Sequence, residues 1–140
     1  MPVKTRLRCA GESHVGMVRQ NNEDRVYLDP DRGIFLVVDG IGGQNAGEQA
    51  ADLALNLVRA RLERQTGTAE DRIREGIAVA NNEILAAAGT NPEWHGMACV
   101  MTVAVAENGR AVVGHVGDSR LYKIRQREIR KITHDHSPVG

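Results

Sequence analysis

The chain has 140 residues, of which 41% are hydrophobic and 26% charged, and these values are typical of a soluble globular protein with one core. Its 18 lysines and arginines balance its 18 aspartates and glutamates, and only 3% of its residues are aromatic. Nucleic acids and anionic membranes require a positive surface, and single strands also require aromatic stacking platforms. The composition therefore predicts no nucleic-acid partner and no membrane partner.

Cysteine usage and hydropathy point to the cytoplasm. Cys9 and Cys99 lie far apart without a CxxC motif, which favours two reduced structural thiols. Residues 1–6 contain no apolar stretch of the kind found in signal peptides. The longest nearly apolar run, residues 98–106, is too short to span a bilayer. We therefore expect a cytoplasmic protein with a single domain over residues 1–140.

Two strands joined by a turn are expected first. Residues 24–28 alternate between polar and apolar types, and residues 34–38 form a β-branched, apolar run typical of a buried strand. Between them, residues 29–33 read Asp-Pro-Asp-Arg-Gly, and these residue types favour a turn.

Two amphipathic helices are expected next. Apolar residues recur at helical spacing over residues 46–62, with arginines and glutamates on the opposite face. A second stripe covers residues 73–88. Thr68 is a candidate N-cap of this second helix, and Gly89 is its expected end.

The remaining segments predict hairpins. Residues 100–106 and 110–116 flank Glu-Asn-Gly at residues 107–109, and Asn-Gly between apolar runs is the strongest short-range hairpin signal. Residues 121–124 and 128–132 predict another hairpin. Helices segregated from antiparallel hairpins indicate the α+β class rather than a parallel, doubly wound sheet.

Carboxylates gather around the first predicted hairpin. Glu23 and Asp24 stand at the start of its first strand, and Asp39 follows its second strand, just before a glycine-rich segment. Carboxylates without neighbouring lysines are ligands for hard divalent cations. A lone arginine beside them, Arg19, suits a phosphate held by two parallel hydrogen bonds. This combination favours phosphoryl chemistry, although Asp39 as a helix cap or as an ion-pair partner of Arg19 is a plainer alternative.

Other motifs fit known sites less well. The glycines after Asp39 lack the third glycine of a dinucleotide-binding loop, because Asn45 stands in its place. Ser119 follows Gly-Asp but lacks the Gly-x-Ser-x-Gly elbow of hydrolases, so a turn-forming hydroxyl is the favoured interpretation. Asp118 is either a carboxylate at the mouth of the cleft or a turn residue. His115, in an apolar run, is expected to be a hydrogen-bonded core histidine.

Four segments taken together resemble the PPM (type 2C) family of metal-dependent serine/threonine protein phosphatases, in its bacterial form. They are residues 13–24, 36–50, 113–122 and 133–137, which occur in the order of the family and span nearly the whole chain. The resemblance implies a β-sandwich of antiparallel sheets flanked by helices. It also implies hydrolysis of phosphoserine and phosphothreonine on proteins by a water activated between two metal ions.

The resemblance implies a role for each matching residue. Arg19 is similar to the arginine that binds the substrate phosphate, and Asp24 is similar to a catalytic carboxylate that orients water. Glu23 and the backbone carbonyl of Gly40 resemble ligands of one metal ion. Asp39 resembles the carboxylate that bridges both ions.

The expected cofactors are two Mn²⁺ or Mg²⁺ ions, since the ligands are oxygen atoms. Asp118 resembles an aspartate near a third, weaker metal position. Ile41 stands where some members carry a histidine that is proposed as a general acid, and Met-Ala-Cys-Val at residues 97–100 replaces a Gly-Thr-Thr stretch. In the family, further strands with two more aspartates follow the position of residue 140. We therefore expect a C-terminally incomplete phosphatase domain.

The resemblance also implies partners. These are phosphorylated proteins, modified by a bacterial serine/threonine kinase. Two alternatives stay open: a non-catalytic module that binds phosphoproteins or regulates a partner, and a phosphohydrolase that acts on small molecules.

Overall fold

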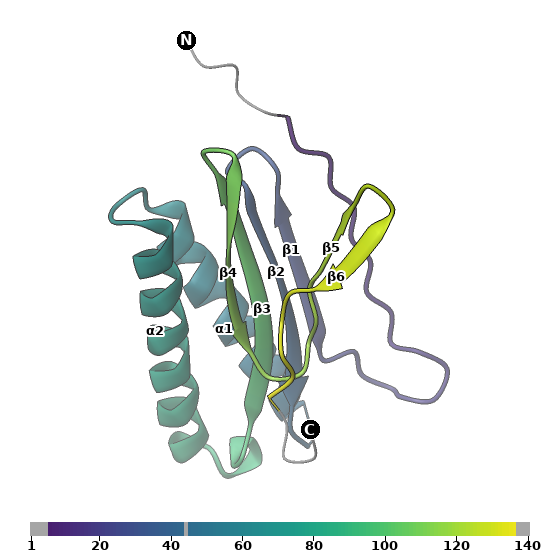
Figure 1. The fold of residues 1–140 in the computed structure, drawn as a ribbon. Coiled ribbons are helices and arrows are strands. Elements are labelled where there is room, and N and C mark those ends of the chain that lie inside the picture. Colours follow the sequence, from purple (N-terminus) through teal and green to yellow (C-terminus); the bar gives the residue numbers. More distant parts are fainter. Residues whose placement is uncertain (1–5, 44, 137–140) are drawn as a thin grey trace.

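The structure is a computed structural model that describes residues 6–43 and 45–136 (Figure 1). The residues outside this part include residues 1–5, where no signal peptide is expected. They also include Gln44 of the second matching segment and Ser137 of the fourth. The elements in chain order are β1 (Asp24–Asp29), β2 (Ile34–Ile41), α1 (Ala46–Glu63), α2 (Ala69–Thr90), the 3₁₀ turn η1 (Pro92–Trp94), β3 (Ala98–Glu107), β4 (Arg110–Val116), β5 (Tyr122–Arg125) and β6 (Glu128–Lys131). This order confirms the predicted α+β class.

The strands form two antiparallel groups. Four of them make one sheet in the order β1-β2-β3-β4, and β5 pairs with β6 in a separate hairpin. Figure 1 shows α1 and α2 on one face of the four-stranded sheet, and the β5–β6 hairpin on the other side. Helix α1 contacts β1, β2 and β3, whereas α2 contacts α1, β3 and β4. The described chain is therefore layered as helices, sheet and hairpin.

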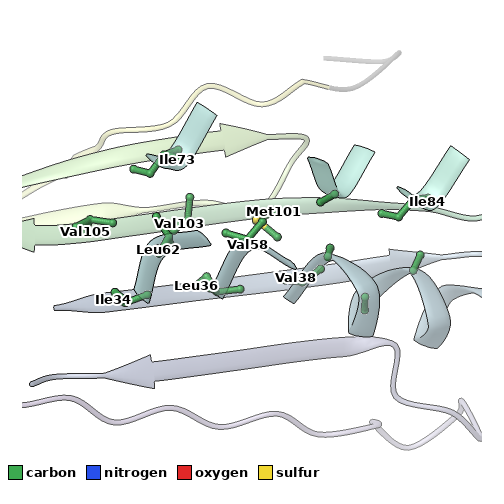
Figure 2. Packing of buried hydrophobic residues seen from close by; sticks show 14 of the residues in the cluster. Ile34, Leu36, Val38, Val58, Leu62, Ile73, Ile84, Met101, Val103 and Val105 are labelled. Atoms are coloured by element: carbon green, nitrogen blue, oxygen red, sulfur yellow. The ribbon is translucent and has the colours of Figure 1, made fainter. Parts of the chain in front are cut away.

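The core lies between the helices and the sheet. Every second residue of β2, beginning with Ile34, turns toward the helices, as the alternation of a strand requires. Figure 2 shows these side chains and those of β3 meeting α1. The largest fully buried side chains are Ile34, Leu36, Leu62, Val38, Val58 and Val103. Burial of each contributes roughly 1.5–3 kcal/mol relative to exposure, so this layer stabilises the fold.

Strand β2 is longer than the sequence predicted. It was expected to end at Val38 but continues to Ile41, because β3 begins at Ala98 and pairs Gly40 with Cys99. Asp39 therefore lies inside a paired strand and does not end the strand. This correction matters for the site, because the ladder of hydrogen bonds fixes the position of Asp39.

The helix boundaries agree closely with the sequence. The hydroxyl of Thr68 accepts a hydrogen bond of 3.1 Å from the backbone N–H of Asp71, which confirms the predicted N-cap of α2. Helix α2 ends at Thr90, one residue beyond the predicted Gly89, and Asn91 follows in an extended conformation. Within the described residues, neither helix combines the length and the hydropathy that a membrane-crossing segment requires.

Both hairpin turns have left-handed backbone conformations. In the β3–β4 turn, Asn108 and Gly109 have φ angles of 53° and 76°, as the Asn-Gly signal predicted. In the β5–β6 turn, Gln126 and Arg127 have φ angles of 51° and 64°. Neither of these side chains favours positive φ, so the second turn carries backbone strain that the first turn avoids.

His115 is hydrogen-bonded as predicted, but it is half-buried and lies opposite Thr102 on the face of the sheet away from the helices, so it is not a core residue. Its Nδ1 lies 2.8 Å from the hydroxyl of Thr102, and its Nε2 lies 2.9 Å from the carbonyl oxygen of His134. Thr133 is buried and its hydroxyl accepts a 3.1 Å hydrogen bond from the backbone N–H of Leu121. These bonds hold the segment after β6 against β4, close to Asp118.

Candidate metal centre

Asp24 and Asp39 face each other across the first strand pair. The antiparallel register places Asp24 of β1 directly opposite Asp39 of β2. Because residues opposite each other point to the same face of a sheet, both carboxyls lie on the face away from the helices, within hydrogen-bonding reach of each other. The sequence identified both residues, but it did not predict that they are cross-strand partners.

Asp39 is electrostatically unfavourable in its charged form. Desolvation raises the pKa of its carboxyl, and the charge of Asp24, the hydrogen bond with Asp24 and the charge of Asp118 raise this pKa further. The positive charge of Arg19 lowers it, with a smaller effect. Two adjacent carboxylates of this kind require a shared proton or a cation.

Glu23 lies beside this pair, immediately before β1. Its backbone carbonyl accepts a hydrogen bond of 3.0 Å from the N–H of Gly40, so the start of β1 and the end of β2 are tied together. Oε1 of Glu23 lies 4.0 Å from Nη1 of Arg19. Oε2 is buried and has no hydrogen-bond partner among the residues that the structure describes. A buried carboxylate oxygen without a partner is costly, and a bound cation would relieve this cost.

A cavity of about 290 Å³ opens next to the aspartates. The residues that line it are Glu12, Ser13, His14, Asp24, Arg25, Val26, Val37, Val38, Asp39 and Ser119. Of the predicted site residues, the cavity therefore brings together Asp24 and Asp39. Arg19, Glu23, Gly40 and Asp118 are not part of its lining, although the charges of Arg19 and Asp118 act on Asp39.

Sequence reasoning missed part of this cavity wall. Ser119, interpreted as a turn hydroxyl, contributes to the lining, and so do Ser13 and His14. Residues 6–23 form no helix or strand, so no periodicity could show where they lie. The only available signal was that residues 13 and 14 begin the first of the four matching segments.

Neither plainer alternative for Asp39 agrees with the structure. The N-cap position of α1 is occupied by Asn45, whose side chain makes no capping hydrogen bond, so Asp39 is not the N-cap. The carboxylate nearest to the guanidinium of Arg19 is Glu23, at 4.0 Å, and not Asp39. Within residues 6–43 and 45–136, Asp39 thus neither caps a helix nor forms an ion pair that would explain a carboxylate at this position.

The donor set suits a hard cation but is small. Within residues 6–43 and 45–136, no three side chains of His, Cys, Asp or Glu stand close enough together to hold a metal ion. The donors that the family resemblance implies are the carboxylates of Glu23 and Asp39 and the carbonyl of Gly40. All three are oxygen atoms, which Mg²⁺ and Mn²⁺ prefer, and these ions commonly retain several waters.

The family of the chain follows from a match to a family model. The chain matches the model of the family described as Protein phosphatase 2C over residues 10–138, and it belongs to this family.

Named relatives are bacterial phosphatases. The chain is 33% identical over 132 residues to the serine/threonine phosphatase stp of Listeria monocytogenes, covering 89% of this chain and 52% of that protein. It is also 33% identical over 134 residues to the serine/threonine protein phosphatase PstP of Mycobacterium tuberculosis, covering 95% of this chain and 26% of PstP. The chain thus spans about half the length of the first relative and about a quarter of the second.

Solved structures agree with this family. The crystal structure of the Mycobacterium tuberculosis phosphatase PstP/Ppp superposes with a TM-score of 0.84 at 31% identity, covering 91% of this chain and 54% of that one. The catalytic domain of PstP in complex with two manganese ions superposes with a TM-score of 0.85, also at 31% identity, with 91% and 55% covered. These similarities confirm the predicted family and fold.

Proposed function

We propose that this chain supplies part of a centre that hydrolyses phosphoserine and phosphothreonine in proteins with the help of Mn²⁺ or Mg²⁺. The observation that carries the proposal is the cross-strand pair of Asp24 and Asp39, two carboxyls on the same face of the sheet that line one cavity. This pair disfavours its own negative charge unless a cation binds. Membership of the phosphatase 2C family, and the two manganese ions in the PstP complex, support the same assignment.

Three donors would hold the cations. Glu23 and the carbonyl of Gly40 would bind one ion, and Asp39 would bind both. When bound, the ions would activate a water for attack on phosphorus and neutralise charge on the phosphoryl oxygens. Asp24, the cross-strand neighbour of Asp39, would orient this water, and Asp118 would lie near a weaker, third position.

Arg19 would bind the substrate phosphate. Its side chain is 75% exposed, and its contact with Glu23 is long, at 4.0 Å. A pair of this kind contributes little stability, so the guanidinium can turn to a phosphate without a large loss. A guanidinium and a phosphate form two parallel hydrogen bonds, which would place phosphorus beside the carboxylates.

The relatives also indicate the kind of substrate and its setting. They are named as serine/threonine phosphatases, which supports phosphorylated proteins as substrates. We infer that a bacterial serine/threonine kinase produces these substrates, and that the protein acts in the cytoplasm.

Phosphate release from a phosphothreonine peptide tests this function. Since the chain spans about half of the Listeria relative, the assay should compare the chain alone with the chain joined to the remaining half of that phosphatase. We expect negligible Mn²⁺-dependent turnover from the chain alone and clear turnover from the joined protein. If the joined protein folds but releases no phosphate, the proposed function is wrong.

Arg19→Ala in the joined protein should lower kcat/KM. The loss should correspond to about 2–4 kcal/mol of transition-state stabilisation, the range for losing one charged stabiliser. The Mn²⁺ requirement should stay unchanged, because Arg19 is not a ligand. Arg74→Ala is the matched control, since this exposed arginine of α2 lies outside the site. Equal kinetics for both variants would remove Arg19 from the site.

A second candidate, a module that binds phosphoproteins without turnover, is favoured by the small donor set of the described residues. It predicts that the phosphothreonine peptide binds to the joined protein and stays intact when Mn²⁺ is added.

A further inference from the structure

The first turn of α1 is packed directly against Glu23. A Cβ atom built on Gly47 would lie 2.6 Å from Cδ of Glu23 and would overlap its Oε2. It would also lie 3.1 Å from the carbonyl carbon of Gly40. No real side chain tolerates the first two contacts, so any residue other than glycine at position 47 must displace the Glu23 carboxylate.

Gly40 of β2 packs equally closely against α1. A Cβ atom on Gly40 would overlap the carbonyl oxygen of Gly47 and would lie 3.1 Å from the carbonyl oxygen of Glu23. The backbone N–H of Gly40 already donates to that carbonyl oxygen of Glu23, at 3.0 Å. Gly40, Gly47 and Glu23 therefore form one interlocked contact without room for a methyl group.

The backbone of α1 does not itself require glycine at this position. Gly47 lies within the helix and is not among the glycines with positive φ. Glycine inside a helix is unfavourable relative to alanine, because it loses more conformational entropy on folding. A reason outside the helix is therefore needed. Of the three atoms nearest to the missing Cβ in the described part of the chain, both side-chain atoms belong to Glu23.

The carboxylate held there faces in two directions. Its Oε2 is buried and finds no hydrogen-bond partner within residues 6–43 and 45–136, whereas its Oε1 lies 4.0 Å from Nη1 of Arg19. The partial positive charge at the N-terminus of α1 favours an anionic group at this place.

We propose that Gly47 is a positioning residue of the metal centre. By lacking a side chain, it lets the Glu23 carboxylate settle against α1 in the orientation that binds the cation. This inference rests on the proposed function, because it takes Glu23 to be a metal ligand. Gly47 itself donates nothing to the ion and acts only through Glu23.

The test is a double-mutant cycle on the 140-residue chain, read by Mn²⁺ calorimetry and by thermal melting without metal. Gly47→Ala should weaken Mn²⁺ binding by roughly tenfold or more, the range for residues that orient ligands. Gly89→Ala is the matched control, because Gly89 also lies in a helix but has nothing within 4 Å of its missing Cβ. It should leave the Mn²⁺ affinity unchanged.

The Glu23→Ala background separates the possible outcomes. If Gly47 acts through the carboxylate, adding Gly47→Ala to Glu23→Ala should change the Mn²⁺ affinity by less than about twofold. An equal loss in both backgrounds, or no loss in either, would overturn the inference. If Glu23→Ala alone leaves the affinity unchanged, or if the unmodified chain binds no Mn²⁺, the proposed metal site is wrong instead.

If Gly47→Ala does not fold, thermal melting of the double variant tests the inference. The overlap predicts that adding Glu23→Ala to Gly47→Ala restores a cooperative melt, since of the three nearest contacts the two closest are removed and the 3.1 Å contact with Gly40 is left. A double variant that stays unfolded would show a general packing role for Gly47 and would contradict the inference.

Discussion

The two faces of the four-stranded sheet differ in how they are covered. On the helix side, Leu36 and Val38 of β2 each expose only 2% of their surface. On the opposite side, Val37 between them exposes 38%, and the nearby β5–β6 hairpin exposes 73% of Ile124 and 67% of Ile129. The same sheet is thus a closed core on one side and an open surface on the other.

The difference shows how the fold separates stability from function. The helix-covered face supplies the apolar burial that fixes β2 and its register with β1. The open face carries Asp24 and Asp39, whose mutual repulsion disfavours two negative charges. Under the proposed function, a bound cation would relieve this repulsion. A rigid core thus positions charges on a face that solvent can reach.

Matched leucine truncations should give the largest contrast. Leu62 in α1 is 1% exposed, whereas Leu85 in α2 is 65% exposed. Leu62→Ala removes buried surface and leaves a cavity, so it should lower the free energy of unfolding by about 2–5 kcal/mol. Leu85→Ala should change it by less than about 0.5 kcal/mol. Denaturant unfolding measures both, and comparable losses would mean that the helix layer is not the stabilising core.

Two ion pairs that differ in burial should give a difference in unfolding free energy of intermediate size. Arg72 of α2 is 5% exposed and reaches Glu107 at 3.0 Å, whereas Arg110 reaches Glu70 at 2.8 Å with both side chains well exposed. Glu107→Gln removes the negative partner of a buried guanidinium and should cost about 1–3 kcal/mol of unfolding free energy. Glu70→Gln should cost less than about 1 kcal/mol. Equal costs for the two variants would contradict the burial assigned to Arg72.

The smallest effect concerns the two hairpin turns. Arg127→Gly relieves a left-handed residue with φ of 64°, so it should stabilise the chain by about 0.5–1 kcal/mol. Gly109→Ala places a side chain at φ of 76° and should destabilise by a similar amount, since no atom lies within 4 Å of the new methyl group. Thermal melting should show opposite shifts, and shifts of the same sign would refute the strain assigned to the β5–β6 turn.

Local signals in the sequence were enough to predict both helices and the hairpins, although not the end of β2 or the 3₁₀ turn η1. Apolar periodicity gave both helices, Thr68 marked the start of α2, and Asn-Gly at residues 108–109 marked the β3–β4 turn. Each of these signals depends on residues close together in the chain. The β5–β6 hairpin was also predicted, although its turn residues, Gln126 and Arg127, are unusual for left-handed positions.

Features set by distant contacts were beyond local signals. Strand β2 continues through Asp39 because β3 pairs with it, about sixty residues further along the chain. Ser13 and His14 reach the cavity from a segment without regular structure. Gly47 looked like an ordinary residue of a helix, and only the position of Glu23 shows why it lacks a side chain.

Under the proposed function, Glu23, Asp39 and the carbonyl of Gly40 together bind a divalent cation. Calorimetric titration of the 140-residue chain with Mn²⁺ tests it most directly, with Asp39→Asn as the variant. Asp31→Asn is the control, because this exposed turn aspartate lies outside the site. We expect one weak site in the unmodified chain and in the control, and a loss of at least about tenfold in Asp39→Asn, since one charged ligand is removed. Mn²⁺ affinity in Asp39→Asn equal to that of the unmodified chain would contradict the account.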